Sequence, residues 1–136
     1  MLPLRYSQRW RIAGVLVLVA VFGATVAPAF GLFSSSAVDR LFEFDKWLHG
    51  FTFLFLTVWF TGQYARRAYW RVIVGLTLFG VFIEFCQRFL TYRTSDPADV
   101  AANVAGIVLG LAIALAGLGG WSLRVESWLV ARRASA

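Results

Sequence analysis

Apolar residues follow one another along this chain in four long runs, separated by short polar connections. A helix needs roughly 20 residues to cross about 30 Å of hydrocarbon, and each run approaches that length. The pattern therefore predicts an all-α membrane protein with a single domain, 1–136, built as a bundle of four transmembrane helices. The predicted spans are 12–33, 47–63, 70–90 and 98–120.

The tail after the fourth predicted span, residues 121–136, has a different pattern. Trp121, Val125, Trp128 and Leu129 recur at helical spacing, and the arginines of the tail lie mostly elsewhere. This arrangement is typical of a helix that lies on a membrane surface. We therefore expect a C-terminal interfacial amphipathic helix.

Composition supports a bilayer environment, since 60% of the 136 residues are hydrophobic. The formal net charge of +6 is distributed unevenly, and most basic residues lie before the first span, around the second connection and in the tail. Because basic residues favour the cytoplasmic side, this bias predicts that both termini are cytoplasmic. The charge is a topology signal and does not indicate nucleic-acid binding. The residues on that side are Arg5, Arg9, Arg11, Arg66, Arg67, Arg71, Arg124, Arg132 and Arg133.

The N-terminus also fits a cleavable secretory signal, because arginines, an apolar run and "APA" at 27–29 follow one another. The apolar run continues past this site to Phe33, which favours an uncleaved span. Cleavage stays an alternative for residues 1–29. Cys86 is the only cysteine, so the sequence predicts neither an intrachain disulfide nor a cysteine metal site.

Acidic residues gather on the outward half of the predicted bundle. Three polar pairs there stand four residues apart and therefore share a helix face. The pairs are Asp45 with His49, Glu84 with Arg88, and Asp99 with Asn103, and Gln87 lies beside the second pair.

Small residues continue these polar faces toward the bundle centre. Gly106 and Gly110 follow Asn103 on the fourth span, and Gly80 lies one turn before Glu84. Glycines at such spacing let neighbouring helices approach closely. We therefore expect a polar pocket that opens to the outer face and is closed below by tight packing of the second, third and fourth helices.

Several of these residues also have purely structural explanations. Asp96, Pro97 and Asp99 form the pattern of a helix start, with a cap, a first-position proline and an acid in the first turn. Asp45 would similarly cap the second helix. Interfacial placement or interhelical hydrogen bonding would account for three more residues: Lys46, Arg88 and Asn103.

Glu84 and His49 are harder to explain in this way. An ionised carboxylate inside a span costs on the order of 2 kcal/mol or more unless it is paired or hydrated. Glu84 lies about two turns inside its span, and His49, the only histidine, lies in the same predicted layer. These two residues are the candidates for a catalytic role.

Three stretches carry a resemblance to a known family. They are "DKWLH" at 45–49, "EFCQ" at 84–87 and "RTSDPADVAANVAGIVLG" at 93–110. In this order, the stretches resemble the motifs of the VanZ-like family of small polytopic membrane proteins. The link between Gln87 and Arg93 lacks the Pro-Gly often found there. The family's motif positions correspond to Asp45, Lys46, His49, Glu84, Gln87, Arg93, Asp96, Asp99, Asn103, Gly106 and Gly110.

The resemblance implies a multi-pass protein of the bacterial cytoplasmic membrane that acts in the cell envelope. The founding member of the family is associated with antibiotic resistance, at a low level, to the glycopeptide teicoplanin. That association describes a phenotype and implies no biochemical activity, so the mechanism must come from the residues themselves.

Three classes of function fit the residues. In the first, cations bind the phosphate or carboxylate of an anionic envelope lipid, a lipid-linked intermediate or a glycopeptide-related ligand. In the second, His49 and Glu84 act as base and acid, or join Asp45 and Asp99 in holding a catalytic metal. In the third, a transporter moves protons through Glu84 and His49. The cations of the first class are Lys46, Arg88 and Arg93.

Binding is the favoured class. A single histidine gives little support for a metal enzyme, and no serine or cysteine nucleophile stands beside it. A transport path would need polar groups in the cytoplasmic half, where Glu126 is the only acid. The sequence therefore predicts membrane lipids as partners and predicts no cofactor and no metal.

Overall fold

The computed structural model describes residues 1–26, 38–90 and 96–134, with side chains for 1–26, 46–90 and 96–132. This part of the chain is all-helical and contains no strand, as predicted. The elements are α1 (Ser7–Val26), α2 (Val38–Thr61), the short turn η2 (Arg66–Ala68), α3 (Tyr69–Gln87), α4 (Pro97–Ile113), the π-helical turn η3 (Ala114–Leu118) and α5 (Trp121–Ala134).

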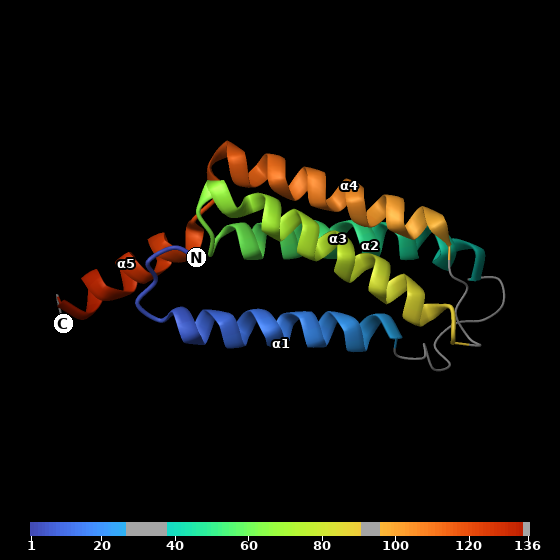
Figure 1. Ribbon diagram of the computed structural model, residues 1–136, viewed down its shortest axis with the longest axis horizontal. Coiled ribbons are helices and arrows are strands. Elements are labelled where there is room, and N and C mark those ends of the chain that lie inside the picture. The colour runs from blue at the N-terminus through green and yellow to red at the C-terminus, as the bar shows by residue number, and fades with distance from the viewer. Residues whose placement is uncertain (27–37, 91–95, 135–136) are drawn as a thin grey trace.

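The first four α-helices lie lengthwise beside one another, and α5 leaves the bundle at the end where the N-terminus lies (Figure 1). α2 and α4 make the most extensive helix–helix contact, and α3 packs against both. α1 lies along the other side of the bundle and contacts α2 and α3 less. The expected association of the second, third and fourth helices is therefore observed.

Three segments among the described residues are long and apolar enough to cross a membrane. They are Ser7–Val26, Arg66–Gln87 and Pro97–Leu118. α2, which contains most of the second predicted span, is not among them. The structure thus supports three of the four predicted spans.

The helix boundaries differ from the predicted ones mainly at α2. This helix begins at Val38 rather than at Trp47. Asp45 therefore lies inside the helix, and its alternative role as a helix cap is wrong. α1 likewise begins at Ser7, before the predicted start at residue 12. The candidate cleavage site at 27–29 lies outside the described residues.

The start of α4 has the capping geometry that the sequence predicts. Asp96 is the N-cap residue, its Oδ1 accepts a hydrogen bond of 2.9 Å from the backbone amide of Ala98, and Pro97 follows it. This hydrogen bond, together with the nearby Lys46 ammonium, holds the pKa of the Asp96 carboxyl below its usual range. The cap fixes the point at which α4 enters the bundle.

Two glycines of α4 let its backbone contact α2 directly. A Cβ atom at Gly106 would overlap the carbonyl oxygen of Gly50, and one at Gly110 would lie 2.8 Å from the carbonyl oxygen of Leu54. No side chain fits in either position without moving the helices apart. Gly106 and Gly110 therefore lie where α2 and α4 approach most closely, which is where a packing role was expected.

α5 is tied to the start of α1 by a buried carboxylate. Glu126 accepts hydrogen bonds from the backbone amides of Arg5 (2.7 Å) and Tyr6 (3.0 Å) and from the indole nitrogen of Trp10 (2.8 Å). Amides at a helix start have no partner within the helix, so Glu126 caps α1 from the opposite end of the chain. We call this arrangement the Glu126 clamp.

Burial tends to raise the pKa of the Glu126 carboxyl, but the three hydrogen bonds and the Arg5 charge outweigh it and lower the pKa below its usual value. The tail forms a helix, with Ser122 and Glu126 buried against the bundle, and its interfacial amphipathic character stays a prediction. Val125, Trp128 and Leu129 are exposed.

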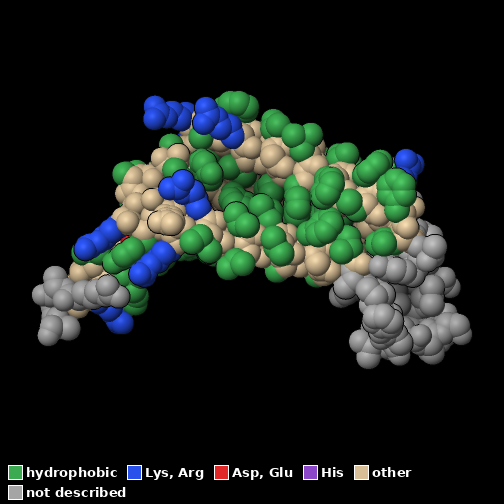
Figure 2. Space-filling model, turned by 60° about the horizontal axis from the view of Figure 1, so that its bottom comes forward, with side chains coloured by type: hydrophobic (Ala, Val, Ile, Leu, Met, Phe, Trp, Pro, Cys, Tyr) green, Lys and Arg blue, Asp and Glu red, His purple; other side chains and the backbone are tan. Residues whose placement is uncertain are grey.

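The surface of the described residues is apolar along much of the helix lengths. Figure 2 shows hydrophobic side chains over the middle of one face and basic side chains gathered toward the end that carries α5. An exposed apolar surface of this extent is unusual in a soluble monomer and is expected against lipid. Large exposed side chains include Leu16, Val19, Leu78, Phe85 and Val108.

Candidate functional site

The centre of the candidate site is a hydrogen bond between α2 and α4. Nδ1 of His49 lies 3.1 Å from Oδ1 of Asn103, and both side chains are buried. Because an amide oxygen only accepts hydrogen bonds, Nδ1 carries the proton. The Nε2 atom of a neutral His49 ring therefore keeps its lone pair and is available to a ligand.

The amide nitrogen of Asn103 is buried and has no hydrogen-bond partner in the part of the chain that the structure describes. It faces α3, since a Cβ atom added to Gly80 would lie 3.1 Å from it. The absence of a side chain at Gly80 is what lets α3 approach Asn103 this closely. Phe53 of α2 packs against the same glycine, since its Cζ atom would lie 3.1 Å from that Cβ atom.

Glu84 lies one helical turn beyond Gly80, on the buried face of α3. Its side chain is 8% exposed, and neither carboxylate oxygen has a hydrogen-bond partner among the described residues. Burying such a group without partners is unfavourable by several kcal/mol in transfer scales, so buried polar groups are normally satisfied. Two unsatisfied polar groups therefore lie along one face of α3. The Glu84 carboxylate is on that face, and the amide nitrogen of Asn103, from α4, meets it one turn earlier, at Gly80.

α1 also contributes to the site, which the sequence did not indicate. Nε2 of Gln87 donates a hydrogen bond of 3.0 Å to the backbone carbonyl of Thr25, near the end of α1. A cavity of about 110 Å³ lies between α1 and α2 and is lined by His49, Thr25 and Thr52 together with apolar side chains. The imidazole of His49 therefore lines a cavity and contacts Asn103 at the same time.

Charged residues lie at the edge of this site. Nζ of Lys46 is 3.3 Å from Oδ2 of Asp96, and both side chains are 44% exposed. Asp99 is buried on the same face of α4 as Asn103, one turn closer to the helix start. Arg88 is exposed at the end of α3. The side chain of Asp45 and all of Arg93 lie outside the described residues.

The structure thus brings together one central group of the predicted residues and leaves others at the edge. His49 and Asn103 are in contact, while Glu84, Gln87 and Asp99 are buried on the neighbouring faces. Among the described side chains, no three His, Cys, Asp or Glu residues lie close enough together to hold a metal ion. The side chains of this group can form hydrogen bonds and exchange protons.

The comparison with known families agrees with the motifs of the site. The sequence profile of the VanZ/LLP1 family matches residues 5–118. The chain belongs to the VanZ/LLP1 family. The matched range contains α1 to α4 and every candidate site residue, and it ends before α5. The Glu126 clamp therefore joins a segment outside the VanZ/LLP1 match to the start of α1.

One relative of this VanZ/LLP1 protein comes from the fission yeast Schizosaccharomyces pombe. Uncharacterized protein C11E3.10 is 33% identical over 119 residues, which cover 82% of this chain and 68% of the yeast protein. No solved structure gives a significant match. Because a relative occurs in a fungus, membership alone does not specify a bacterial or glycopeptide ligand, and the ligand must be argued from the site.

Proposed function

We propose that this chain is an integral membrane protein that binds the headgroup of a lipid-linked envelope intermediate in the polar site of α2, α3 and α4. The observation that carries the proposal is the presence of two buried, unsatisfied groups, the Glu84 carboxylate and the Asn103 amide. A carboxylate accepts and an amide nitrogen donates, and a hydroxyl group can satisfy both. A sugar or other hydroxylated headgroup has this chemistry.

The basic residues at the edge of the site suit the phosphate of such a lipid. Lys46 is held by Asp96 in an exposed ion pair, which is weak and can be exchanged for another anion. Arg88 is exposed one helical turn beyond Glu84. The lipid phosphate would bind the basic side chains at the edge of the site, and its hydroxylated group would bind Glu84 and Asn103 at the centre.

The membrane arrangement follows from this assignment. α2 is the remaining span, the site faces outward, and both termini lie on the cytoplasmic side of a bacterial membrane, where α5 rests on the surface. The arginine-rich end of the bundle supports this orientation. A role in teicoplanin resistance would follow if the bound headgroup belongs to a cell-wall intermediate.

Binding to defined lipids in nanodiscs tests the proposal. The probes are a polyprenyl diphosphate that carries one sugar and the same polyprenyl diphosphate without it. We expect the sugar-bearing lipid to bind more tightly, and Glu84→Gln or Asn103→Leu to weaken its binding about tenfold. Glu126→Gln is the matched control, because it changes a buried carboxylate at the opposite end. Unchanged binding by both site variants would contradict the proposal.

A second candidate function is acid–base catalysis on the same lipid. The hydrogen bond to Asn103 fixes the His49 tautomer and leaves Nε2 free to accept a proton, as in an oriented general base. Glu84 would then be the acid. Release of the sugar or of phosphate from the probe lipid by the wild-type protein, but not by His49→Gln, would favour this candidate over binding alone.

A further inference from the structure

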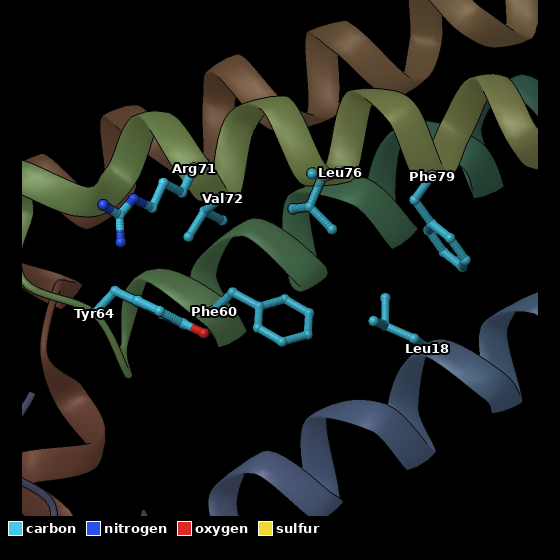
Figure 3. Close-up of a pocket in the computed structure, with 8 residues that line it drawn as sticks. Leu18, Phe60, Tyr64, Arg71, Val72, Leu76 and Phe79 are labelled. Atoms are coloured by element: carbon cyan, nitrogen blue, oxygen red, sulfur yellow. The ribbon is translucent and has the colours of Figure 1, made fainter. Parts of the chain in front are cut away.

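A second cavity extends from the arginine-rich end of the bundle along α3 as far as Phe79. It measures about 370 Å³ and opens between α1, α2 and α3. Its walls are apolar side chains from all three elements, and its polar residues are Tyr64 and Arg71. Leu18, Phe60, Leu76 and Phe79 contribute to the walls, as the close-up shows (Figure 3).

The order of residues along α3 gives this cavity a direction. Arg71 lies near the start of α3, and Val72, Gly75, Leu76 and Phe79 follow on the same side. Figure 3 shows Arg71 and Tyr64 at one end of the cavity and Phe79 at the other. The cavity is therefore a groove with a cationic end and an apolar length, which runs from the membrane edge toward the bilayer centre.

An empty apolar groove of this size is not stable inside a bilayer. Protein interiors and lipid chains are both closely packed, and a void forfeits the dispersion contacts of its walls. The groove also follows a helix that is apolar enough to span the membrane. A lipid acyl chain has the shape and polarity to fill it.

The polar end of the groove has the chemistry that binds phosphate. A guanidinium group forms paired hydrogen bonds with phosphate oxygens, and a tyrosine hydroxyl donates one more. The guanidinium carbon of Arg71 lies 5.3 Å from the ring centroid of Trp70, which holds the side chain at the level where interfacial tryptophans lie. The neighbouring Arg66 is engaged elsewhere, since it donates a 3.2 Å hydrogen bond to the carbonyl of Leu115.

We propose that this groove binds one anionic phospholipid of the leaflet at the arginine-rich end, with an acyl chain between α1 and α3 and its phosphate on Arg71 and Tyr64. The site is separate from the polar site of α2, α3 and α4 and does not depend on its function. The bound chain fills the space where α1 packs loosely, so it also fastens α1 to the rest of the bundle.

A substitution at Gly75 tests whether an acyl chain occupies the groove. A Cβ atom at Gly75 meets no atom within 4 Å, so a larger residue fits without disturbing the helices but enters the groove. Gly23 on α1 is the matched control, because its Cβ position is equally open and it does not line the groove. Gly75→Leu should displace the lipid, and Gly23→Leu should retain it.

Arg71 provides the test of the headgroup. Arg71→Gln should weaken binding of phosphatidylglycerol about tenfold and remove its preference over phosphatidylcholine, whereas Arg71→Lys should retain part of that preference. Arg67→Gln is the control, because Arg67 is an exposed arginine of the same connection and does not line the groove.

Native mass spectrometry of the purified full chain with defined phosphatidylglycerol or phosphatidylcholine measures both effects. The expected result is one retained phosphatidylglycerol in the wild type, lost in Gly75→Leu and retained in Gly23→Leu. Equal losses in Arg71→Gln and Arg67→Gln would indicate diffuse charge attraction and overturn the headgroup site. Retention by Gly75→Leu would show that no chain occupies the groove and would overturn the proposal.

Discussion

Nδ1 of His49 donates to Oδ1 of Asn103 across 3.1 Å, which joins the only histidine of the chain to the polar face of α4. Both residues are at most 4% exposed, so the bond is shielded from water. A hydrogen bond in such surroundings fixes the ring orientation as well as the tautomer. The position of the imidazole is therefore determined by the packing of α2 against α4.

The first prediction concerns this tautomer. Because Asn103 accepts from Nδ1, the neutral His49 ring should carry its proton on Nδ1, and Asn103→Ala should allow both tautomers. Nitrogen NMR of isotope-labelled histidine reports this ring alone, since no other histidine is present. Asp96→Asn serves as the control at the edge of the site. An unchanged spectrum in Asn103→Ala would show that the hydrogen bond does not set the tautomer.

Much of the site could be predicted from the sequence because helix geometry makes spacing informative. Asp99 and Asn103 share a face at four-residue spacing, and Gly106 and Gly110 extend it, so one buried stripe follows from the pattern alone. The structure confirms that all four residues are buried. The same reasoning placed Glu84 and Gly80 on one face of α3.

Contacts between distant segments could not be predicted in this way. The carbonyl of Thr25 that binds Gln87 is a backbone group, and backbone acceptors leave no mark in a sequence. Glu126 caps α1 from the far end of the chain, so nothing near either residue signals the contact. The early start of α2 was missed because polar residues before Trp47 resemble a connection, although they continue the helix.

The second prediction concerns the contact between α2 and α4. Gly106→Ala should lower the free energy of unfolding by about 1–3 kcal/mol, because the added methyl group overlaps the backbone of Gly50. Gly23→Ala is the control, since its Cβ position meets no atom within 4 Å. Denaturant unfolding in detergent measures both variants. Equal stability of the two would show that α2 and α4 do not approach as closely as described.

The third prediction concerns the Glu126 clamp. The pKa of Glu126 is lowered by folding, so its stabilisation is fully present above an unfolded-state pKa of about 4.3 and is lost as the pH falls through the lower folded-state pKa. Glu126→Gln should therefore destabilise the protein at neutral pH by about 1–3 kcal/mol, and by much less at about pH 3.

Thermal unfolding of the wild type and Glu126→Gln at the two pH values measures this difference. Asp96→Asn is the control, because the Asp96 pKa is also lowered but its side chain is 44% exposed and its ion pair is weak. The difference in stability between the wild type and Glu126→Gln should depend on pH. A difference that does not change with pH would show that the charge of Glu126 does not stabilise the contact between α5 and the start of α1.

The fourth prediction concerns orientation in the membrane. In a Cys86→Ser background, cysteines introduced at Ser35 and Thr94 should react with an impermeant thiol reagent added to intact cells. A cysteine at Ala68, in the arginine-rich connection, should react only after the membrane is opened. The reverse labelling pattern would show that the polar site faces the cytoplasm and would exclude an outward-facing pocket.

The last prediction separates the stability of the bundle from its function at Glu84. Among the described residues Glu84 has no hydrogen-bond partner, so its replacement leaves no partner unpaired. An apolar residue of similar size should therefore remove an unfavourable buried group. Glu84→Leu is expected to raise the free energy of unfolding by about 1–3 kcal/mol and to abolish binding of the sugar-bearing probe lipid.

This combination of higher stability and lost binding is expected when a polar group is kept for its ligand rather than for the fold. Ile83→Ala is the control of opposite sign, because Ile83 is fully buried in the apolar core beside Glu84 and its truncation should destabilise by about 2–5 kcal/mol. Denaturant unfolding and lipid binding are measured on the same samples. A destabilised Glu84→Leu variant would mean that the carboxylate is satisfied within the folded chain, and Glu84 would then be a structural residue rather than the centre of a binding site.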